Sequence, residues 1–121
     1  MRSDVDVAIV GAGVSGAAIA RTLSAYQLDV ALVEKEAEVS FGTSKANSGI
    51  IHGGFHHPGK YLKTRLEVQG NVMFDRLQRE LDFPFRRCGI LVAALKDEEM
   101  KYINHLYEQG LANGAIGIEM C

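Results

Sequence analysis

The fold is decided by residues 5–34, which read VDVAIVGAGVSGAAIARTLSAYQLDVALVE. The β-branched run that opens this stretch has almost nothing polar after Asp6, which is typical of a strand buried on both faces of a parallel sheet. Residues 17–26 are Ala-rich and have the composition of a helix, and residues 30–33 predict a second buried strand that ends at Glu34. Strand, glycine turn, helix and strand together predict one right-handed crossover unit.

The turn between the first strand and the helix carries the pattern Gly11-x-Gly13-x-x-Gly16, and Glu34 follows 23 positions after Gly11. In this context the pattern is the fingerprint of a dinucleotide-binding unit. Gly11 permits the sharp turn, Gly13 lets the backbone approach a pyrophosphate, and Gly16 lets the helix pack closely on the strand. Unpaired N–H groups at the start of the helix are suited to bind the negative charge of the phosphates.

Glu34 is expected to accept hydrogen bonds from the ribose hydroxyls of an adenosine. A carboxylate at this position would repel a 2′-phosphate, which argues against an NADP-type ligand. The fingerprint alone does not choose between NAD and FAD. From the residues alone, a tight turn with a solvated acid at the end of the strand is the alternative.

Composition narrows the classes of function. The 121 residues are 47% hydrophobic and 23% charged, as in a soluble globular domain, and 13 basic against 15 acidic residues leave a net charge of −2. This balance predicts no nucleic-acid partner. The apolar run within residues 7–20 is interrupted by glycines and too short for a transmembrane segment. Cys88 and Cys121 give neither a disulfide framework nor metal-ligand spacing, so a reduced, cytoplasmic setting is expected.

The remaining chain begins with an irregular stretch, residues 36–59, of the kind that usually carries function. Residues 60–81 predict a long amphipathic helix with a close backbone contact at Gly70. Residues 89–95 and 115–120 are strand-like, and a further helix is expected over residues 97–113, capped by Asp97 and ended by Gly114. Cys88 is expected to be a buried small hydrophobe.

Residues 43–60 read TSKANSGIIHGGFHHPGK. With the fingerprint before them, they resemble the N-terminal region of FAD-dependent oxidoreductases with a D-amino-acid-oxidase-like fold. Within these, the sequence is most similar to glycerol-3-phosphate dehydrogenases and L-2-hydroxyglutarate oxidases. The features that carry the resemblance are Val33-Glu34, the string at 47–54, Pro58-Gly59 before a long helix, and the FPF-x-x-x-G entry at 83–89.

The resemblance implies an α/β fold: a Rossmann-like βαβ FAD-binding unit, partial in its doubly wound parallel sheet, with the start of a second, substrate domain. Residues 1–84 would be the N-terminal part of the FAD-binding domain and residues 85–121 the truncated beginning of the substrate domain. FAD is the implied cofactor, with the loop after Ser44 running past the pyrophosphate and along the isoalloxazine. The implied cofactor-binding residues are Gly11, Gly13, Val14, Ser15, Gly16, Glu34, Lys35, Thr43, Ser44, Asn47, Ser48, Gly49 and Ile50.

The resemblance also places His52 near the edge of the flavin, where an imidazole could orient substrate or manage a proton. The alternative for this candidate catalytic residue is a histidine that only hydrogen-bonds loop carbonyls. His52, His56 and His57 have no nearby Cys or acidic partner in the sequence, so no metal site is predicted. Arg86 and Arg87 could meet an anionic substrate, although adjacent residues of a strand point to opposite faces.

The implied activity is hydride transfer from a small anionic 2-hydroxy compound, such as glycerol 3-phosphate, to flavin. His56 stands where glycerol-3-phosphate dehydrogenases have an arginine, which favours the branch shared with 2-hydroxyglutarate oxidation. The alternatives are an L-2-hydroxyglutarate oxidase-type fragment, an NAD-dependent dehydrogenase fragment, and a non-catalytic remnant that self-associates.

The chain is interpreted as an N-terminal fragment or natural truncation, inactive by itself, because members of the family that it resembles run to several hundred residues. Without later strands, one edge of the strand at residues 5–10 would lie open and apolar. Such an edge predicts a homo-oligomer. A cytoplasmic location is expected, with peripheral membrane association compatible with a full-length enzyme.

Overall fold

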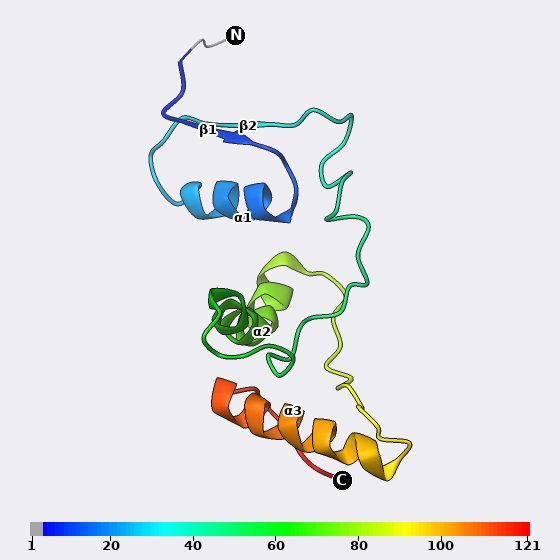
Figure 1. Cartoon of the computed structure of the whole chain (residues 1–121). Helices are drawn as coiled ribbons and strands as arrows, with labels where there is room; N and C mark the ends of the chain where they lie inside the picture. The colour runs from blue at the N-terminus through cyan, green and yellow to red at the C-terminus, as the bar shows by residue number, and fades with distance from the viewer. Residues whose placement is uncertain (1–3) are drawn as a thin grey trace. The chain divides into compact units, whose positions relative to one another are not determined.

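The computed structural model describes residues 4–121 as two compact units, one ending at Gly49 and the other beginning at Ile50. The elements of the first unit are β1 (Val7–Val10), α1 (Val14–Leu23) and β2 (Val30–Val33). Those of the second unit are α2 (Leu62–Leu81), a 3₁₀ turn η1 (Asp97–Glu99) and α3 (Met100–Asn113) (Figure 1).

In the first unit, β1 and β2 pair in parallel, with Val7 opposite Val30 and Val10 opposite Val33. The connection between them is α1, which lies against this two-stranded sheet (Figure 1). The predicted strand–helix–strand unit is therefore present. The helix begins at Val14, three residues earlier than composition indicated, so Gly16 lies in its first turn and not in the loop before it.

The prediction that both faces of the first strand are buried is wrong for the described residues. Only Ile9 of β1 is buried, whereas Val10 is 87% exposed. Burial on both faces needs a layer of structure on each side of the sheet. Within residues 4–121 the sheet is covered by α1 alone, so the alternate positions of the strand face solvent.

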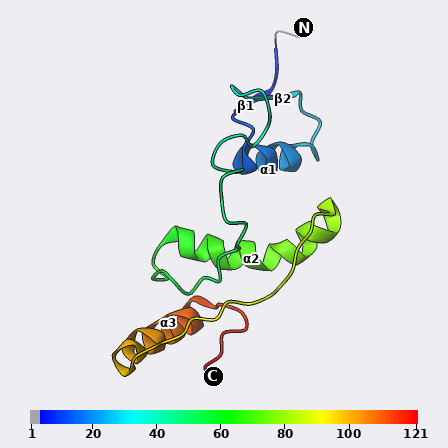
Figure 2. The ribbon, with the colours of Figure 1, turned by 90° about the vertical axis from the view of Figure 1, so that its right-hand side faces the viewer.

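In the second unit, α2 and α3 contact each other (Figure 2). Helix α2 ends at Asp82, which adopts a left-handed conformation (φ +50°) and donates its N–H to the carbonyl of Gln78. Helix α3 ends, as predicted, at Gly114 with φ +78°. Asp97 does not cap α3 as predicted, because it lies inside the 3₁₀ turn η1. The N-cap residue of α3 is Glu99, whose carboxylate accepts a 2.8 Å hydrogen bond from the N–H of Leu95.

The strand-like segments 89–95 and 115–120 form no strand in the described part of the chain. A β-strand forms only where its backbone is hydrogen-bonded to a neighbouring strand. Within residues 4–121, the one sheet contains only β1 and β2, so these two segments pair with no strand. Gly70 makes no close contact either, since a Cβ there would meet nothing within 4 Å. Cys88 is exposed rather than buried. The domain boundary after residue 84 stays a prediction.

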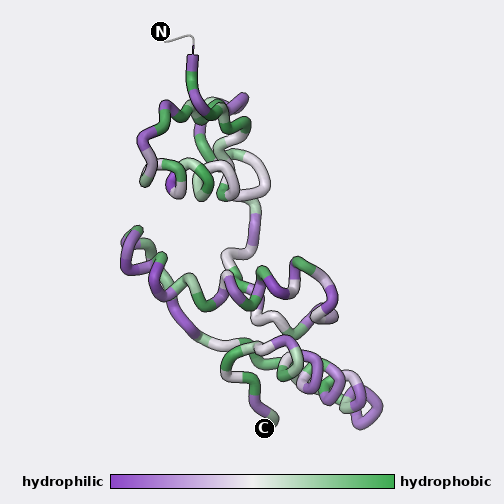
Figure 3. The backbone as a smooth tube through the Cα atoms, turned by 90° about the vertical axis from the view of Figure 1, so that its left-hand side faces the viewer, coloured by the Kyte–Doolittle hydropathy of each residue, from purple (hydrophilic) through white to green (hydrophobic). Residues whose placement is uncertain are grey.

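Hydrophobic and hydrophilic residues alternate along α2, the longest helix, as the colouring of Figure 3 shows. Its predicted apolar stripe is largely exposed: Leu62, Leu66 and Leu81 each keep half or more of their surface accessible. None of the helices formed by the described residues combines the length and hydrophobicity that a membrane crossing requires.

Candidate functional site

The turn between β1 and α1 brings the helix as close to the strand as a backbone can lie. Gly11 has φ +99°, a conformation that glycine adopts without strain. A Cβ at Gly16 would overlap the carbonyl oxygen of Gly11 and lie 3.4 Å from Cγ2 of Ile9. Gly16 is also one of the few buried residues of the unit. Glycine is therefore required at this position for the helix to pack on the strand.

Ser44 closes over the start of α1 from the following loop. Its Oγ accepts a 2.9 Å hydrogen bond from the N–H of Val14, and a Cβ added to Gly13 would lie only 3.0 Å from the same oxygen. Asn47 holds this loop by donating Nδ2 to the carbonyl of Ser44 (2.6 Å) and by accepting the N–H of Gly49 at Oδ1 (2.8 Å).

The first turn of α1 keeps free donors. Within residues 4–121, the N–H groups of Ser15 and Gly16 have no hydrogen-bond partner, as expected for the first residues of a helix. Gly13, the N-cap residue, provides no side chain to satisfy them. These amides lie at the positive end of the helix dipole, so the turn is suited to bind a phosphate group.

Glu34 is fixed at the end of β2 by three backbone amides. Its Oε2 accepts the N–H of Ala12 at 2.7 Å, and its Oε1 accepts those of Lys35 (2.8 Å) and Glu36 (3.1 Å). The hydrogen bond from Ala12, followed by that from Glu36, holds the pKa of the Glu34 carboxyl below its ordinary value. A carboxylate has about four lone-pair positions, so one acceptor position remains for a ligand.

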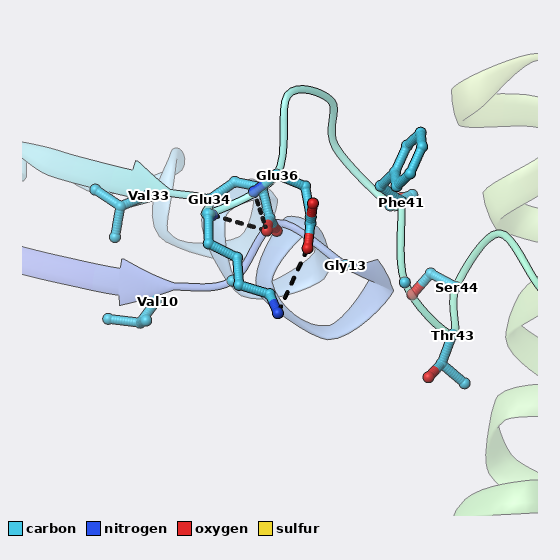
Figure 4. A pocket seen from close by; sticks show the side chains of 12 residues that line it. Val10, Gly13, Val33, Glu34, Glu36, Phe41, Thr43 and Ser44 are labelled. Atoms are coloured by element: carbon cyan, nitrogen blue, oxygen red, sulfur yellow. Dashed lines mark hydrogen bonds and ion pairs between the residues drawn. The ribbon is translucent and has the colours of Figure 1, made fainter.

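A cavity of about 620 Å³ lies at the carboxyl ends of β1 and β2, and residues of the glycine turn, of the end of β2 and of the following loop line it (Figure 4). Six of its lining residues were predicted from the sequence: Gly11, Gly13, Glu34, Lys35, Thr43 and Ser44. Six others were missed: Val10, Val33, Glu36, Ser40, Phe41 and Gly42. A ligand crevice at the carboxyl ends of parallel strands is the usual place for a nucleotide.

The missed residues differ in how visible they are in the sequence. Val10 and Val33 adjoin residues that were singled out, and their side chains lie at the ends of the two strands (Figure 4). Phe41, an aromatic residue beside a glycine in an irregular stretch, could have been noticed for that reason. Ser40 has no such signal: it lies at the cavity because its N–H bonds the carbonyl of Ala12 (2.9 Å) and its φ is +62°.

The other seven predicted cofactor-binding residues are not among those that line the cavity: Val14, Ser15, Gly16, Asn47, Ser48, Gly49 and Ile50. Lys35 does line it, but its ammonium is exposed and 3.4 Å from the carboxylate of Glu36. Ser48 is exposed at the end of the first unit. Ile50, 66% exposed, and His52 belong to the second unit.

His52 opens a loop, residues 52–58, that has no secondary structure but is held by side chains of α2 and α3. From α2, Asn71 donates to the carbonyl of His52 (2.9 Å) and Thr64 to that of Pro58 (3.0 Å). From α3, Gln109 donates to the carbonyl of Phe55 (2.7 Å), and Asn113 donates to those of Gly54 and His57 (2.8 Å each). The loop backbone is therefore fixed by the two helices.

The imidazole of His52 is 62% exposed, and its Nδ1 lies 3.9 Å from Oε1 of Glu67. It is the backbone of this residue, not the ring, that takes part in the hydrogen bonds of the loop. His56 stacks on Phe55, with ring centroids 4.0 Å apart. Within residues 4–121, no three His, Cys, Asp or Glu side chains come together as metal ligands would.

Arg87, considered for an anionic substrate, is engaged with α2. It donates to both carboxylate oxygens of Asp75 (2.8 and 2.7 Å) and to Oδ1 and the carbonyl of Asn71 (2.9 Å each). The hydrogen bond from Arg87 holds the pKa of Asp75 below its ordinary value, and the same bond raises that of Arg87. Its guanidinium thus ties residue 87 to α2. Arg86, its neighbour, is exposed.

Comparison with known proteins places this geometry in context. The family model described as FAD dependent oxidoreductase matches residues 6–120. A glycerol 3-phosphate dehydrogenase of Caloramator mitchellensis is 57% identical over 109 residues, and a mitochondrial L-2-hydroxyglutarate dehydrogenase of Nematostella vectensis is 40% identical over 117 residues. These matches cover 90% and 95% of this chain.

Among solved structures, the dithionite-reduced L-alpha-glycerophosphate oxidase of Mycoplasma pneumoniae with FAD bound superposes with a TM-score of 0.81 and 36% identity over 90% of this chain. This chain corresponds to 23%, 26% and 29% of the lengths of these three proteins, in the order named. It therefore spans about a quarter of the length of the relatives that it matches.

Proposed function

We propose that this chain, which belongs to the FAD dependent oxidoreductase family, binds the ADP part of FAD in the cavity between the β1–α1 turn and Glu34. The observation that supports this most is the Gly11–Gly16 turn itself, in which Gly16 leaves no room for a Cβ and the amides of Ser15 and Gly16 are free. FAD is the cofactor of the family and is bound in the oxidoreductase structure that this chain resembles.

The residues at the cavity fit the parts of an ADP moiety. The free amides of Ser15 and Gly16, which follow the lining residue Gly13, would receive the pyrophosphate, and Thr43 and Ser44 line the cavity with their hydroxyl groups (Figure 4). The remaining acceptor position of Glu34 would take one ribose hydroxyl. When bound, FAD supplies the acceptance of a hydride, and the chain supplies binding and orientation.

For the whole protein, we propose oxidation of a small anionic 2-hydroxy compound. Two relatives support this class, since one is named for glycerol 3-phosphate and the other for L-2-hydroxyglutarate, and both substrates carry a secondary hydroxyl and an anionic group. Glycerol 3-phosphate is favoured by the higher identity of the Caloramator protein. His52, exposed on a rigid loop, is the candidate in this chain for handling the proton of that hydroxyl.

The cofactor part of the proposal is tested by titrating the purified chain with FAD, NAD⁺ and NADP⁺ in a calorimeter. We expect saturable binding of FAD, competition by ADP, and weaker binding of NADP⁺ because Glu34 is a carboxylate. Binding of NAD⁺ in preference to FAD would support the dehydrogenase alternative. Binding of none of these nucleotides would contradict the proposal and favour a remnant without cofactor.

We also propose self-association through the sheet. In the described part of the chain β1 pairs only with β2, so its other edge offers unpaired backbone groups, and Val10 beside it is 87% exposed. Multi-angle light scattering should show a dimer or larger species. A single monomer across the accessible concentration range would contradict this.

We propose a reducing, cytoplasmic setting. Its support is that both cysteines of the chain are exposed and unpaired. Fractionation of cells that produce the protein, followed by thiol labelling of the soluble fraction, should find both thiols free. Recovery of the protein in an oxidising compartment would contradict this.

A further inference from the structure

Helix α2 contacts His52 at two points, one on its backbone and one on its side chain. Asn71 donates to the carbonyl of His52 at 2.9 Å, and Glu67, one turn earlier on the same helix, brings Oε1 to 3.9 Å from Nδ1. Residues four apart lie on one face of a helix. One face of α2 therefore contacts both the backbone and the imidazole ring of His52.

The anchor on the backbone is itself fixed. Arg87 donates to Oδ1 and to the carbonyl of Asn71, and both oxygens of Asp75, the next residue on this face, bind the guanidinium. Because Oδ1 is engaged by Arg87, the Nδ2 group of Asn71 must face the carbonyl of His52. The position of the ring relative to Glu67 is thus set by a connected network rather than by one contact.

The carboxylate of Glu67 lies in an environment that is unfavourable for a charged group. Its side chain is only 13% exposed, and within the described residues its Oε2 is buried without a hydrogen-bond partner. A buried polar atom without a partner is costly, and a hydrophobic residue of similar size would avoid that cost. Packing alone does not explain a carboxylate here, whereas an acceptor beside an imidazole does.

We propose that Glu67 is a positioning residue for His52. Its carboxylate oxygen, 3.9 Å from Nδ1, attracts a proton on that nitrogen and so favours the Nδ1–H tautomer of the neutral imidazole. This tautomer leaves Nε2 as the acceptor for the hydroxyl proton of the substrate. The inference rests on the proposed function for the role of Nε2, and on the structure alone for the tautomer.

The tautomer is measured by long-range proton–nitrogen correlation spectra of the chain labelled with ¹⁵N-histidine, at a pH where histidines are neutral. We expect the Nδ1–H form at His52 in the unmodified chain, its loss in Glu67→Leu, and its retention in Glu67→Gln, whose amide oxygen still accepts. The matched control is Glu80→Leu, on the same helix about 20 Å away, which should leave the signal unchanged.

An Nε2–H form in the unmodified chain would overturn the proposal, whether or not the Leu variant folds. An unchanged tautomer in a folded Glu67→Leu chain would overturn it as well. In the FAD-loaded whole protein, Glu67→Leu should lower kcat by about 10- to 100-fold with little change in KM, and Glu67→Gln should recover part of the loss. A chain that shows the Nδ1–H form but binds no FAD contradicts the proposed function and not this inference.

Discussion

The backbone N–H of Ala12 donates a 2.7 Å hydrogen bond to the carboxylate of Glu34. This bond joins the turn after β1 to the end of β2, the two places where an ADP moiety would be held. Glu34 therefore has a structural role before any ligand is present, in addition to the ligand contact expected of it. The two roles can be separated by experiment.

Glu34→Gln should destabilise the chain at neutral pH and not in acid. The pKa of this carboxyl is lowered by folding from an ordinary value of 4.5, so its stabilisation is present above that value and lost as the pH falls through the folded-state pKa. Thermal unfolding of the variant and the unmodified chain should therefore differ at pH 7 and converge once the pH falls below the folded-state pKa of Glu34. Glu36→Gln is the control, since its carboxylate pairs only with the exposed Lys35 among the described residues. An equal difference at both pH values would contradict the role of the charge.

Gly16→Ala should abolish FAD binding and lower the free energy of unfolding by about 1–3 kcal/mol, because the new Cβ overlaps the carbonyl of Gly11. The matched control is Gly70→Ala within α2, where a Cβ meets nothing within 4 Å. That change should stabilise the chain by about 0.5–1 kcal/mol, since glycine is unfavourable inside a helix. Chemical denaturation measures both. Equal effects of the two substitutions would contradict the close packing of α1 on β1.

Asn113→Ala should loosen the loop that carries His52. The change removes the donor to two carbonyls, those of Gly54 and His57, and each half-buried acceptor left without a partner costs about 1–3 kcal/mol. Hydrogen exchange of the amides in residues 52–58 should become faster, while exchange in residues 7–33 stays the same. Asn104→Ala, at an exposed position of α3, should leave the loop unaffected.

Arg87→Lys should lower stability slightly, since an ammonium cannot reproduce the two-point contact with Asp75 and this pair is about half exposed. Folding lowers the pKa of Asp75 from an ordinary value of 3.8, so the contribution of the pair is present above that value and lost in stronger acid. A double-mutant cycle with Asp75→Asn at pH 7 and pH 2.5 measures it. A coupling energy that is the same at both pH values would show that the charge plays no part.

The βαβ unit could be predicted because three independent signals agree in 30 consecutive residues. The β-branched runs indicated strands, the alanines indicated a helix, and the glycines at 11, 13 and 16 indicated how the two are joined. These are local properties, and the parallel pairing of β1 with β2 follows from the helical crossover between them. Three of the residues that line the cavity, Gly11, Gly13 and Glu34, follow from the same stretch, whereas Lys35, Thr43 and Ser44 were implied by the family resemblance.

What could not be predicted depends on partners distant in sequence. Strand-like composition at 89–95 does not provide a neighbouring strand, and a β-branched run at Val7–Val10 does not provide a second covering layer. The bond of Asn113 to a loop 56 residues earlier, and that of Ser40 to Ala12, have no local signal. Side-chain pairs such as Asp75 with Arg87 become visible only in the folded chain, because the two residues are 12 positions apart and belong to different segments.

Binding of the ADP part of FAD between the start of α1 and Glu34 can be tested by titrating the ¹⁵N-labelled chain with FAD and following assigned amide resonances. We expect saturable shifts that are largest at residues 13–16, 34–36 and 43–44, and the same pattern with ADP alone. Shifts confined to other residues, or no change at millimolar FAD, would contradict it.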